Sequence, residues 1–192
     1  MTQKVDRRIQ RTRQLLHKAL IELIMEKPYD QITVQDILDR ANIGRATFYA
    51  HFPDKDALLL GGMDEDHFDI RLYLDEAEIA VDEGKLLPCY SLFRHAQQFY
   101  PLYKAMLGGN GIEMVKKAFH KHLVHAIEQR IKRYAPTVSL PLPLVSHYLA
   151  GALMSLIIWW LDHEMPHSPE EMDTMVQQIV MLGLERLSHE QS

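Results

Sequence analysis

A chain of 192 residues, of which 47% are hydrophobic and 24% are charged, can bury a sizeable core, which excludes a disordered polypeptide. The formal net charge of −5 excludes a uniformly basic nucleic-acid-binding protein, but residues 1–55 carry ten Lys or Arg against seven Asp or Glu, giving +3, and the remainder carries 11 against 19, giving −8. The single cysteine, Cys89, cannot form an internal disulfide, and the basic N-terminus MTQKVDRRIQRTR has no apolar signal segment, so we expect a cytoplasmic protein.

The first residues predict a basic arm followed by a helix. Residues 1–8 are polar and are expected to be mobile without a partner. Two interpretations of this arm stay open: a solvated tail, or a segment that reaches the groove or phosphates of a nucleic acid through Lys4, Arg7, Arg8 and Arg11. Residues 9–25 predict a helix that ends before Pro28, with an apolar stripe formed by Leu16, Ala19, Leu20, Leu23 and Ile24.

A second, shorter helix is predicted to start at Val34. The Thr33 side chain can accept a hydrogen bond from a backbone N–H one turn on, and Asp36 stands where the partner in a capping box would be. Spacing of i, i+3, i+4 and i+7 gives the helix one apolar face, formed by Val34, Ile37, Leu38 and Ala41. A tight turn is expected next, because Asn42 and Gly44 tolerate turn conformations.

A third helix is predicted over residues 45–52, where Pro53 ends it. Phe48 and Phe52 are four residues apart and are expected to face a core. Hydrogen-bond donors lie beside or away from that face, at Arg45, Thr47, Tyr49 and His51. Two short helices joined by a tight turn are typical of the helix-turn-helix, whose second helix enters the DNA major groove. A surface helix with ordinary polar cover fits the period and composition equally well.

The stretch IGRATFYAHFPDKDALL carries a denser signal than periodicity, in Gly44, Arg45, Thr47, Phe48, Tyr49, His51, Phe52, Lys55 and Leu58. The types of these residues and their order along the chain resemble the signature of the TetR/AcrR family of one-component transcriptional regulators. With the preceding TVQDILDRA and the helix before it, the resemblance covers roughly residues 9–60. It therefore supports DNA binding and gives no information about a ligand.

The resemblance implies an N-terminal helix-turn-helix DNA-binding domain of three helices, residues 1–53, and a helical ligand-binding and dimerisation domain, residues 54–192. The residues expected at DNA are Thr33, Gly44, Arg45, Ala46, Thr47, Tyr49, His51 and Lys55. We assign Tyr49 and Lys55 to phosphates, whereas Arg45 fits either a phosphate or a base.

The rest of the chain predicts further helices and no strand, so the expected fold class is all-α. A linker helix is expected from about Asp54, with a bend or break near Gly61-Gly62, because each glycine costs roughly 1 kcal/mol in a helix interior. Later helices are expected over residues 87–107, 112–134, 142–163 and 170–188. The first of these is expected to split near Tyr100, since Pro101 removes a backbone donor.

The last two helices predict an assembly surface. Apolar residues occupy nearly the whole circumference of the helix over 142–163, which one packed face does not explain. Its longest apolar run, Tyr148 to Leu161, is about 14 residues against the ~20 needed to cross a bilayer, so we expect a buried helix and no membrane contact. The resemblance implies a homodimer through these two helices, and burial within one subunit is the alternative.

The resemblance also implies an inducer that binds the C-terminal domain and releases a palindromic operator, with repression as the family's usual mode. We expect a small apolar or aromatic molecule. Candidate contacts are polar or aromatic residues on otherwise apolar helices: His67, Arg71, His95, Phe99, Tyr103, Phe119, His122, Trp159 and His163. Each of them also fits an ordinary core or surface position.

Other functions find less support. The sequence contains no G-x-S-x-G and no phosphate-binding glycine loop, so neither an enzyme nor a cofactor is expected. His120, His122 and His125 cannot all point to one ligand from a single helix, and no metal is expected. Two alternatives stay open: a His-based metal sensor completed from another helix, and a DNA-binding or scaffold protein with no small-molecule input.

Overall fold

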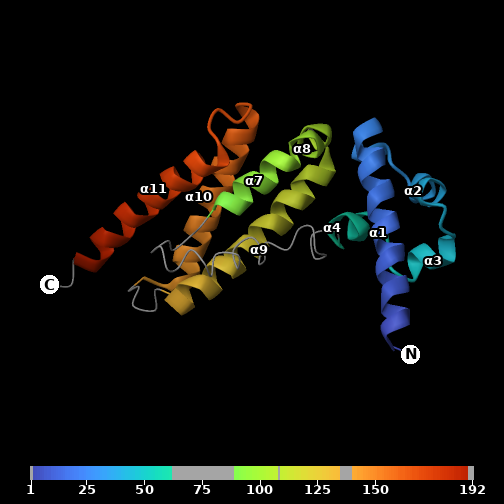
Figure 1. Cartoon of the computed structure of the whole chain (residues 1–192), viewed down its shortest axis with the longest axis horizontal. Coiled ribbons are helices and arrows are strands. Elements are labelled where there is room, and N and C mark those ends of the chain that lie inside the picture. Colours follow the sequence, from blue (N-terminus) through green and yellow to red (C-terminus); the bar gives the residue numbers. More distant parts are fainter. Residues whose placement is uncertain (1, 62–88, 108, 135–139, 190–192) are drawn as a thin grey trace. The chain divides into compact units, whose positions relative to one another are not determined.

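The computed structural model describes residues 2–61, 89–107, 109–134 and 140–189, and every regular element in these ranges is a helix (Figure 1). The predicted all-α fold class is therefore confirmed. The described residues form two units by their contacts. One contains residues 2–61 with 101–118, and the other contains residues 89–100 with 119–189.

The first unit is built on a long helix. It contains α1 (Thr2–Glu26), a 3₁₀ turn η1 (Tyr29–Gln31), α2 (Val34–Ala41), α3 (Arg45–Tyr49) and α4 (Lys55–Gly61). Helix α1 packs against α2 and α4 (Figure 1). The most buried side chains of this core, each at most 2% exposed, are Leu16, Ala19, Leu20, Ile24, Ile32, Ile37, Phe48 and Leu58. The predicted apolar stripes of the first two helices thus meet one another and Phe48.

A later segment completes the same core. Helix α8 (Tyr100–Met106) and the start of α9 (Asn110–Tyr134) contribute Met106 and Ile112 to it. The turn between them lies against η1, where the Asn110 backbone N–H donates to Asp30 Oδ2 over 3.2 Å. Residues 101–118 thus belong to this unit although they follow residue 53, which we had predicted as the end of the DNA-binding domain.

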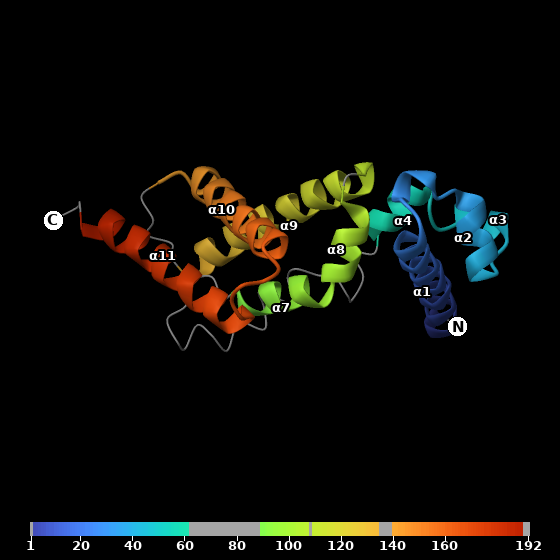
Figure 2. The same cartoon turned by 90° about the horizontal axis from the view of Figure 1, so that it is seen from above.

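The second unit contains α7 (Tyr90–Gln98), α10 (Leu142–Asp162), α11 (Pro169–His189) and the later part of α9. Helix α7 lies beside α10 and α11 (Figures 1 and 2). Phe93 and Trp160, both fully buried, meet edge to face with ring centroids 5.3 Å apart. The buried Asp173 carboxylate of α11 accepts the Cys89 and Tyr90 backbone N–H groups at 2.6 and 3.2 Å, which caps α7.

Most of the predicted helices occur within a few residues of the expected bounds, and the start of α1 is the exception. Residues 2–8, which we expected to form a polar arm before the helix, are the first turns of α1. Helix α10, Leu142–Asp162, matches the helix predicted over residues 142–163. It is the one described helix whose length and composition would suit a membrane span, a test that the core helices of soluble proteins also pass. The predicted split before Pro101 occurs, because α7 ends at Gln98 and α8 begins at Tyr100.

The expected bend of the linker helix lies partly outside the described residues. Helix α4 ends at Gly61, and Gly62 is not among the residues that the structure describes. A Cβ at Gly61 would lie 2.9 Å from Phe52 Cε1, so this glycine lets α4 pass closely over a core ring.

Candidate nucleic-acid interface

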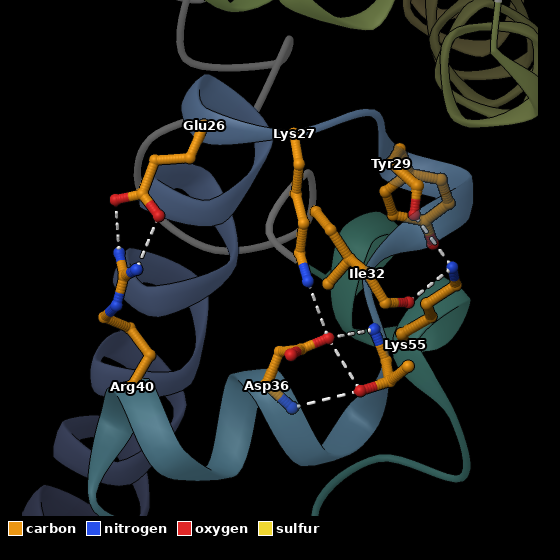
Figure 3. A network of polar contacts seen from close by, with 8 residues as sticks. Glu26, Lys27, Tyr29, Ile32, Asp36, Arg40 and Lys55 are labelled. Atoms are coloured by element: carbon orange, nitrogen blue, oxygen red, sulfur yellow. Dashed lines mark hydrogen bonds and ion pairs between the residues drawn. The ribbon is translucent and has the colours of Figure 1, made fainter.

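Helix α2 begins with the predicted capping box (Figure 3). Thr33 Oγ1 accepts the Asp36 backbone N–H at 3.1 Å, and Asp36 Oδ2 accepts the Thr33 backbone N–H at 2.7 Å. The Thr33 hydroxyl donates its proton to the same carboxylate at 2.7 Å. Lys27 adds an ion pair to Asp36 at 2.9 Å. The hydrogen bonds from Thr33, and then Lys27, lower the pKa of Asp36 below its usual range.

This capping box confirms the N-cap role predicted for Thr33. Its hydroxyl proton and its backbone N–H are both donated to Asp36, so neither is available to a DNA phosphate in this conformation. We had placed Thr33 among the residues at DNA. The capping box fixes the first residue of α2, and hence the position of the turn and helix that follow, while a contact of Thr33 with DNA stays a prediction.

The turn between α2 and α3 depends on one left-handed residue. Asn42 has φ 52° and ψ 47°, a conformation that asparagine tolerates better than most residues. The Ile43 backbone N–H donates to the Leu38 carbonyl oxygen at 3.1 Å, and the Ile43 side chain packs against the core. Gly44 has φ −69° and open space around its missing Cβ, so its conformation does not require glycine. The predicted turn is present, and Asn42 is the residue that makes it.

Helix α3 has one buried side and one exposed side, as predicted. Phe48 is fully buried and the following Phe52 is 3% exposed. The Tyr49 ring meets Phe48 edge to face at 5.3 Å and is 50% exposed. Four neighbouring positions are also exposed: Gly44, Arg45, Ala46 and Thr47. The helix is shorter than predicted and ends at Tyr49, with Ala50 as its C-cap. His51 is half-buried beside Phe52, with ring centroids 6.5 Å apart.

Arg45 is held by a residue that the sequence reasoning missed. Its Nη2 donates to Gln35 Oε1 at 2.7 Å, and Gln35 Nε2 donates to Asp39 Oδ1 at 2.8 Å. This exposed chain joins α2 to the first residue of α3. A guanidinium has five N–H donors, so Arg45 can keep Gln35 and still bind a phosphate or a guanine edge. Gln35 gave no signal in the sequence because an exposed glutamine fits any helix surface.

Lys55 has an internal role that was not expected. Its ammonium donates to the backbone carbonyls of Tyr29 at 2.9 Å and Ile32 at 2.8 Å, and lies 4.4 Å from the Tyr29 ring centroid (Figure 3). The Tyr29 hydroxyl donates to Asp56, the next residue of α4. Burial and this hydrogen bond raise the pKa of Tyr29 well above its usual range. Lys55 therefore ties α4 to η1, which leaves one of its three N–H donors for a phosphate.

A second ion-pair group fixes α2 to α1. The Arg40 guanidinium binds the Glu26 carboxylate with two hydrogen bonds, of 3.0 and 2.6 Å (Figure 3). Its Nη1 also lies 3.5 Å from Glu22. The hydrogen bond from Arg40 lowers the pKa of Glu26. The position of the helix-turn-helix is thus set by contacts at both ends of α2, Lys27 to Asp36 and Arg40 to Glu26.

The expected ligand contacts do not all fall in one unit. Tyr103 packs against the core of the first unit, which argues against an inducer contact. His95 is buried on α7 with its ring centroid 4.4 Å from that of Phe99, and burial lowers its pKa to about 4. Phe119 and His122 are half-buried on α9, and Trp159 and His163 are exposed at the end of α10. His67 and Arg71 lie outside the described residues.

The histidines on α9 form no evident metal centre. His120 and His122 are half-buried, whereas His125 is exposed. In the part of the chain that the structure describes, no group of three or more His, Cys, Asp or Glu side chains has the arrangement to hold a metal ion.

Two models of protein families match this chain. The model of the bacterial regulatory proteins of the tetR family matches residues 16–61, which contain α2, the turn and α3. A model of a transcriptional regulator C-terminal region matches residues 88–182. The chain belongs to the TetR family. Both of the families that match are families of regulators.

Individual members support the same assignment. This TetR-family chain is 29% identical over 174 residues to YxbF, an uncharacterized HTH-type transcriptional regulator of Bacillus subtilis. That match covers 87% of this chain and 44% of YxbF, so the chain spans less than half of that relative.

Solved structures share the fold. A TetR transcriptional regulator from Streptococcus agalactiae has a TM-score of 0.64 and 24% identity over 94% of this chain and 99% of its own. NalD, the secondary repressor of the MexAB-OprM multidrug efflux pump in Pseudomonas aeruginosa, has a TM-score of 0.60 and 17% identity, over 91% of this chain and 97% of its own. At these identities the likeness establishes the fold.

Proposed function

We propose that this TetR-family chain is a repressor that binds a palindromic operator as a homodimer and releases it when a small molecule binds its C-terminal half. The observation that carries the proposal is the polarity of α3. Arg45, Thr47 and Tyr49 present donors to solvent, while Phe48 between them is fully buried. A helix held by its aromatic side and exposed on its donor side can enter a major groove without unfolding its support.

An exposed apolar stripe on α10 supports the homodimer. Leu144, Tyr148 and Trp159 are 60%, 72% and 41% exposed. Gly151 and Ser155, at the spacing that continues this stripe, are exposed and small enough for another helix to approach. On α11, Ile179 is 62% exposed. A second copy that covers these residues would join two α3 helices in one assembly, and joining two weak contacts raises affinity through effective concentration.

The proposed inducer site lies in the second unit. Buried or half-buried His95, Phe99, Phe119 and His122 offer the aromatic surface that a small apolar or aromatic molecule would contact. Residues 119–134 of α9 belong to this unit, and residues 110–118 of the same helix belong to the first. A ligand that moved α9 would therefore act on residues that pack beside η1. Because the target is a chromosomal operator, we place the protein in the cytoplasm.

DNA binding is tested by fluorescence anisotropy of labelled duplexes over a series of salt concentrations. Duplexes drawn from the DNA flanking the protein's own coding region give a first set of candidate operators. We expect the affinity for at least one of them to exceed that for scrambled DNA and to fall steeply with salt, because phosphate contacts release counterions. No binding to any duplex at low salt would contradict the proposal.

Ligand response is tested on the same protein with a thermal-shift screen of apolar and aromatic compounds. An inducer should raise the melting temperature by mass action and, in the same titration, release the labelled duplex. If no compound does both, the alternative without small-molecule input is supported. If only Zn²⁺ or Ni²⁺ does both, and a chelator reverses the effect, the metal-sensor alternative is supported. Reporter expression in cells with and without the protein distinguishes repression from activation.

A further inference from the structure

Three arginines of α1 share one side of a segment whose first residues were expected to be an arm. Helix α1 begins at Thr2, so Arg7, Arg8 and Arg11 lie on helical turns, at i, i+1 and i+4. The helical period places them away from the buried stripe that contains Leu16, Leu20 and Leu23. All three arginines are exposed. We call these three residues the basic stripe.

The basic stripe lies beyond the part of α1 that holds the unit together. Arg13 stacks on Phe52 at 4.7 Å from the ring centroid, close to the end of α3. The N-terminal end of α1 projects past α2 and α3 in both views (Figures 1 and 2). Residues 2–12 are 11 residues, and at ~1.5 Å each they extend ~16 Å, the length of about five base pairs at ~3.4 Å per step.

Charge identifies the partner. The whole chain has a formal net charge of −5, and yet three of its arginines are concentrated and exposed on this short helical surface. A regularly spaced row of guanidinium groups complements a row of phosphates, which are recognised by charge and not by sequence. Exposed charges of one sign on a helix repel one another, so the basic stripe does not stabilise the fold.

We propose that the basic stripe binds the phosphate backbone of double-stranded DNA outside the base pairs that α3 reads. This proposal rests on the proposed function and adds a second contact to it. The stripe contributes affinity without sequence preference. Because its helix is rigidly continuous with the core stripe of α1, it also fixes the angle at which the first unit meets the duplex.

The test compares two variants with the same change of net charge. In the stripe variant, Arg7→Gln, Arg8→Gln and Arg11→Gln remove three charges and keep long, helix-favouring side chains. In the control variant, Lys117→Gln, Lys121→Gln and Lys132→Gln remove three exposed charges from α9. A third variant, with Lys in place of the three arginines, keeps the charge. Thermal melts and circular dichroism confirm that all of them are folded.

We expect the slope of log affinity against log salt to become less steep by about 2.7 in the stripe variant, at ~0.9 per lost phosphate contact. Between 50 and 200 mM salt, the wild type should then lose about 40-fold more affinity than the stripe variant. The ratio of operator to scrambled-DNA affinity should not change. The control and Lys variants should keep the wild-type slope, and trimming about five flanking base pairs should weaken the wild type but not the stripe variant.

Three results would overturn the proposal. The stripe variant could keep the wild-type slope, or the control variant could lose as much of the slope as the stripe variant does. Alternatively, the stripe variant could lose binding only to vesicles of anionic phospholipid, which would assign the stripe to a membrane surface. A wild-type protein that binds no duplex would instead contradict the proposed function itself.

Discussion

The hydroxyl of Tyr49 is the residue-scale detail that best separates a DNA contact from a folding role. The ring is half-exposed and packs edge to face on Phe48. Tyr49→Phe keeps that packing and removes only the donor, so stability should not change. We expect affinity for operator and scrambled DNA to fall together by about tenfold, since a hydrogen bond to a charged phosphate contributes about 1.5 kcal/mol or more. Anisotropy titrations measure both affinities, and a selective loss for the operator would show that Tyr49 reads bases.

Lys55 is expected to affect folding as well as DNA binding. Lys55→Ala leaves the Tyr29 and Ile32 carbonyls without their donor and removes the cation from the Tyr29 ring. We expect urea denaturation to show a loss of about 1–3 kcal/mol in the free energy of unfolding. Lys18→Ala, at an exposed position of α1, is the control and should cost little. Unchanged stability together with weaker DNA binding would restore Lys55 to a purely phosphate-binding role.

At this scale the sequence predicted what is local and missed what is not. The capping box joins residues three apart, and Phe48 and Phe52 are four apart, so period and residue type suffice for both. The carbonyls that bind Lys55 lie 26 and 23 residues before it. Gln35, which holds Arg45, is ten residues away. No spacing rule joins such pairs until η1, α2 and α4 have been packed together.

At the scale of elements, the approach of α9 to η1 depends on Gly111. A Cβ there would lie 2.8 Å from Tyr29 Cδ1 and 3.0 Å from Met106 Cε. Both atoms belong to buried side chains of one core, so neither can move freely. Gly111→Ala should therefore lower the free energy of unfolding by about 1–3 kcal/mol. Urea denaturation measures the loss.

Gly44→Ala provides the comparison for Gly111. Gly44 has an ordinary φ of −69° and nothing within 4 Å of its missing Cβ. The added methyl group should leave stability nearly unchanged. Equal stability of the two alanine variants would mean that α9 is not packed against η1 as the structure shows.

The bounds of elements were predictable where the sequence carries a stop signal. Helix α1 ends at Glu26, shortly before Pro28, and Pro101 marks the break between α7 and α8. The start of α1 was missed because Thr2 to Arg8 contains no apolar stripe, although most of its residues are compatible with a helix that is already nucleated downstream. Helix α3 was overextended, because Phe52 belongs to the core without belonging to the helix.

For the whole molecule, the exposed stripe of α10 predicts a dimer that a single charge can break. Tyr148 is 72% exposed, so Tyr148→Glu should not disturb the fold of one chain. Burying the new carboxylate between two copies would be costly. We expect light scattering to show a dimer for the wild type and a monomer for Tyr148→Glu, with operator affinity at least 100-fold weaker.

Lys121→Glu, at an exposed position of α9, is the matched control for this charge and should remain dimeric. A wild-type monomer in solution, or a Tyr148→Glu protein that is still a dimer, would contradict the assignment of the stripe on α10.

The grouping of the chain into units was the feature least accessible to the sequence. The resemblance to the family placed the end of the DNA-binding domain at residue 53. In the structure, residues 101–118 share its core, through Met106, Ile112 and the contact of Asn110 with Asp30. These partners are 80 residues apart, and each segment alone is an ordinary amphipathic helix or turn. Only packing shows that they belong together.

Selection of bound duplexes from a random pool tests the central claim most directly, because it reads out both the DNA-facing α3 and its two-fold repetition. The full-length protein should enrich a palindrome whose half-sites are about one helical turn, or a little more, apart. Enrichment of no sequence, or of a single unrepeated site, would contradict the account.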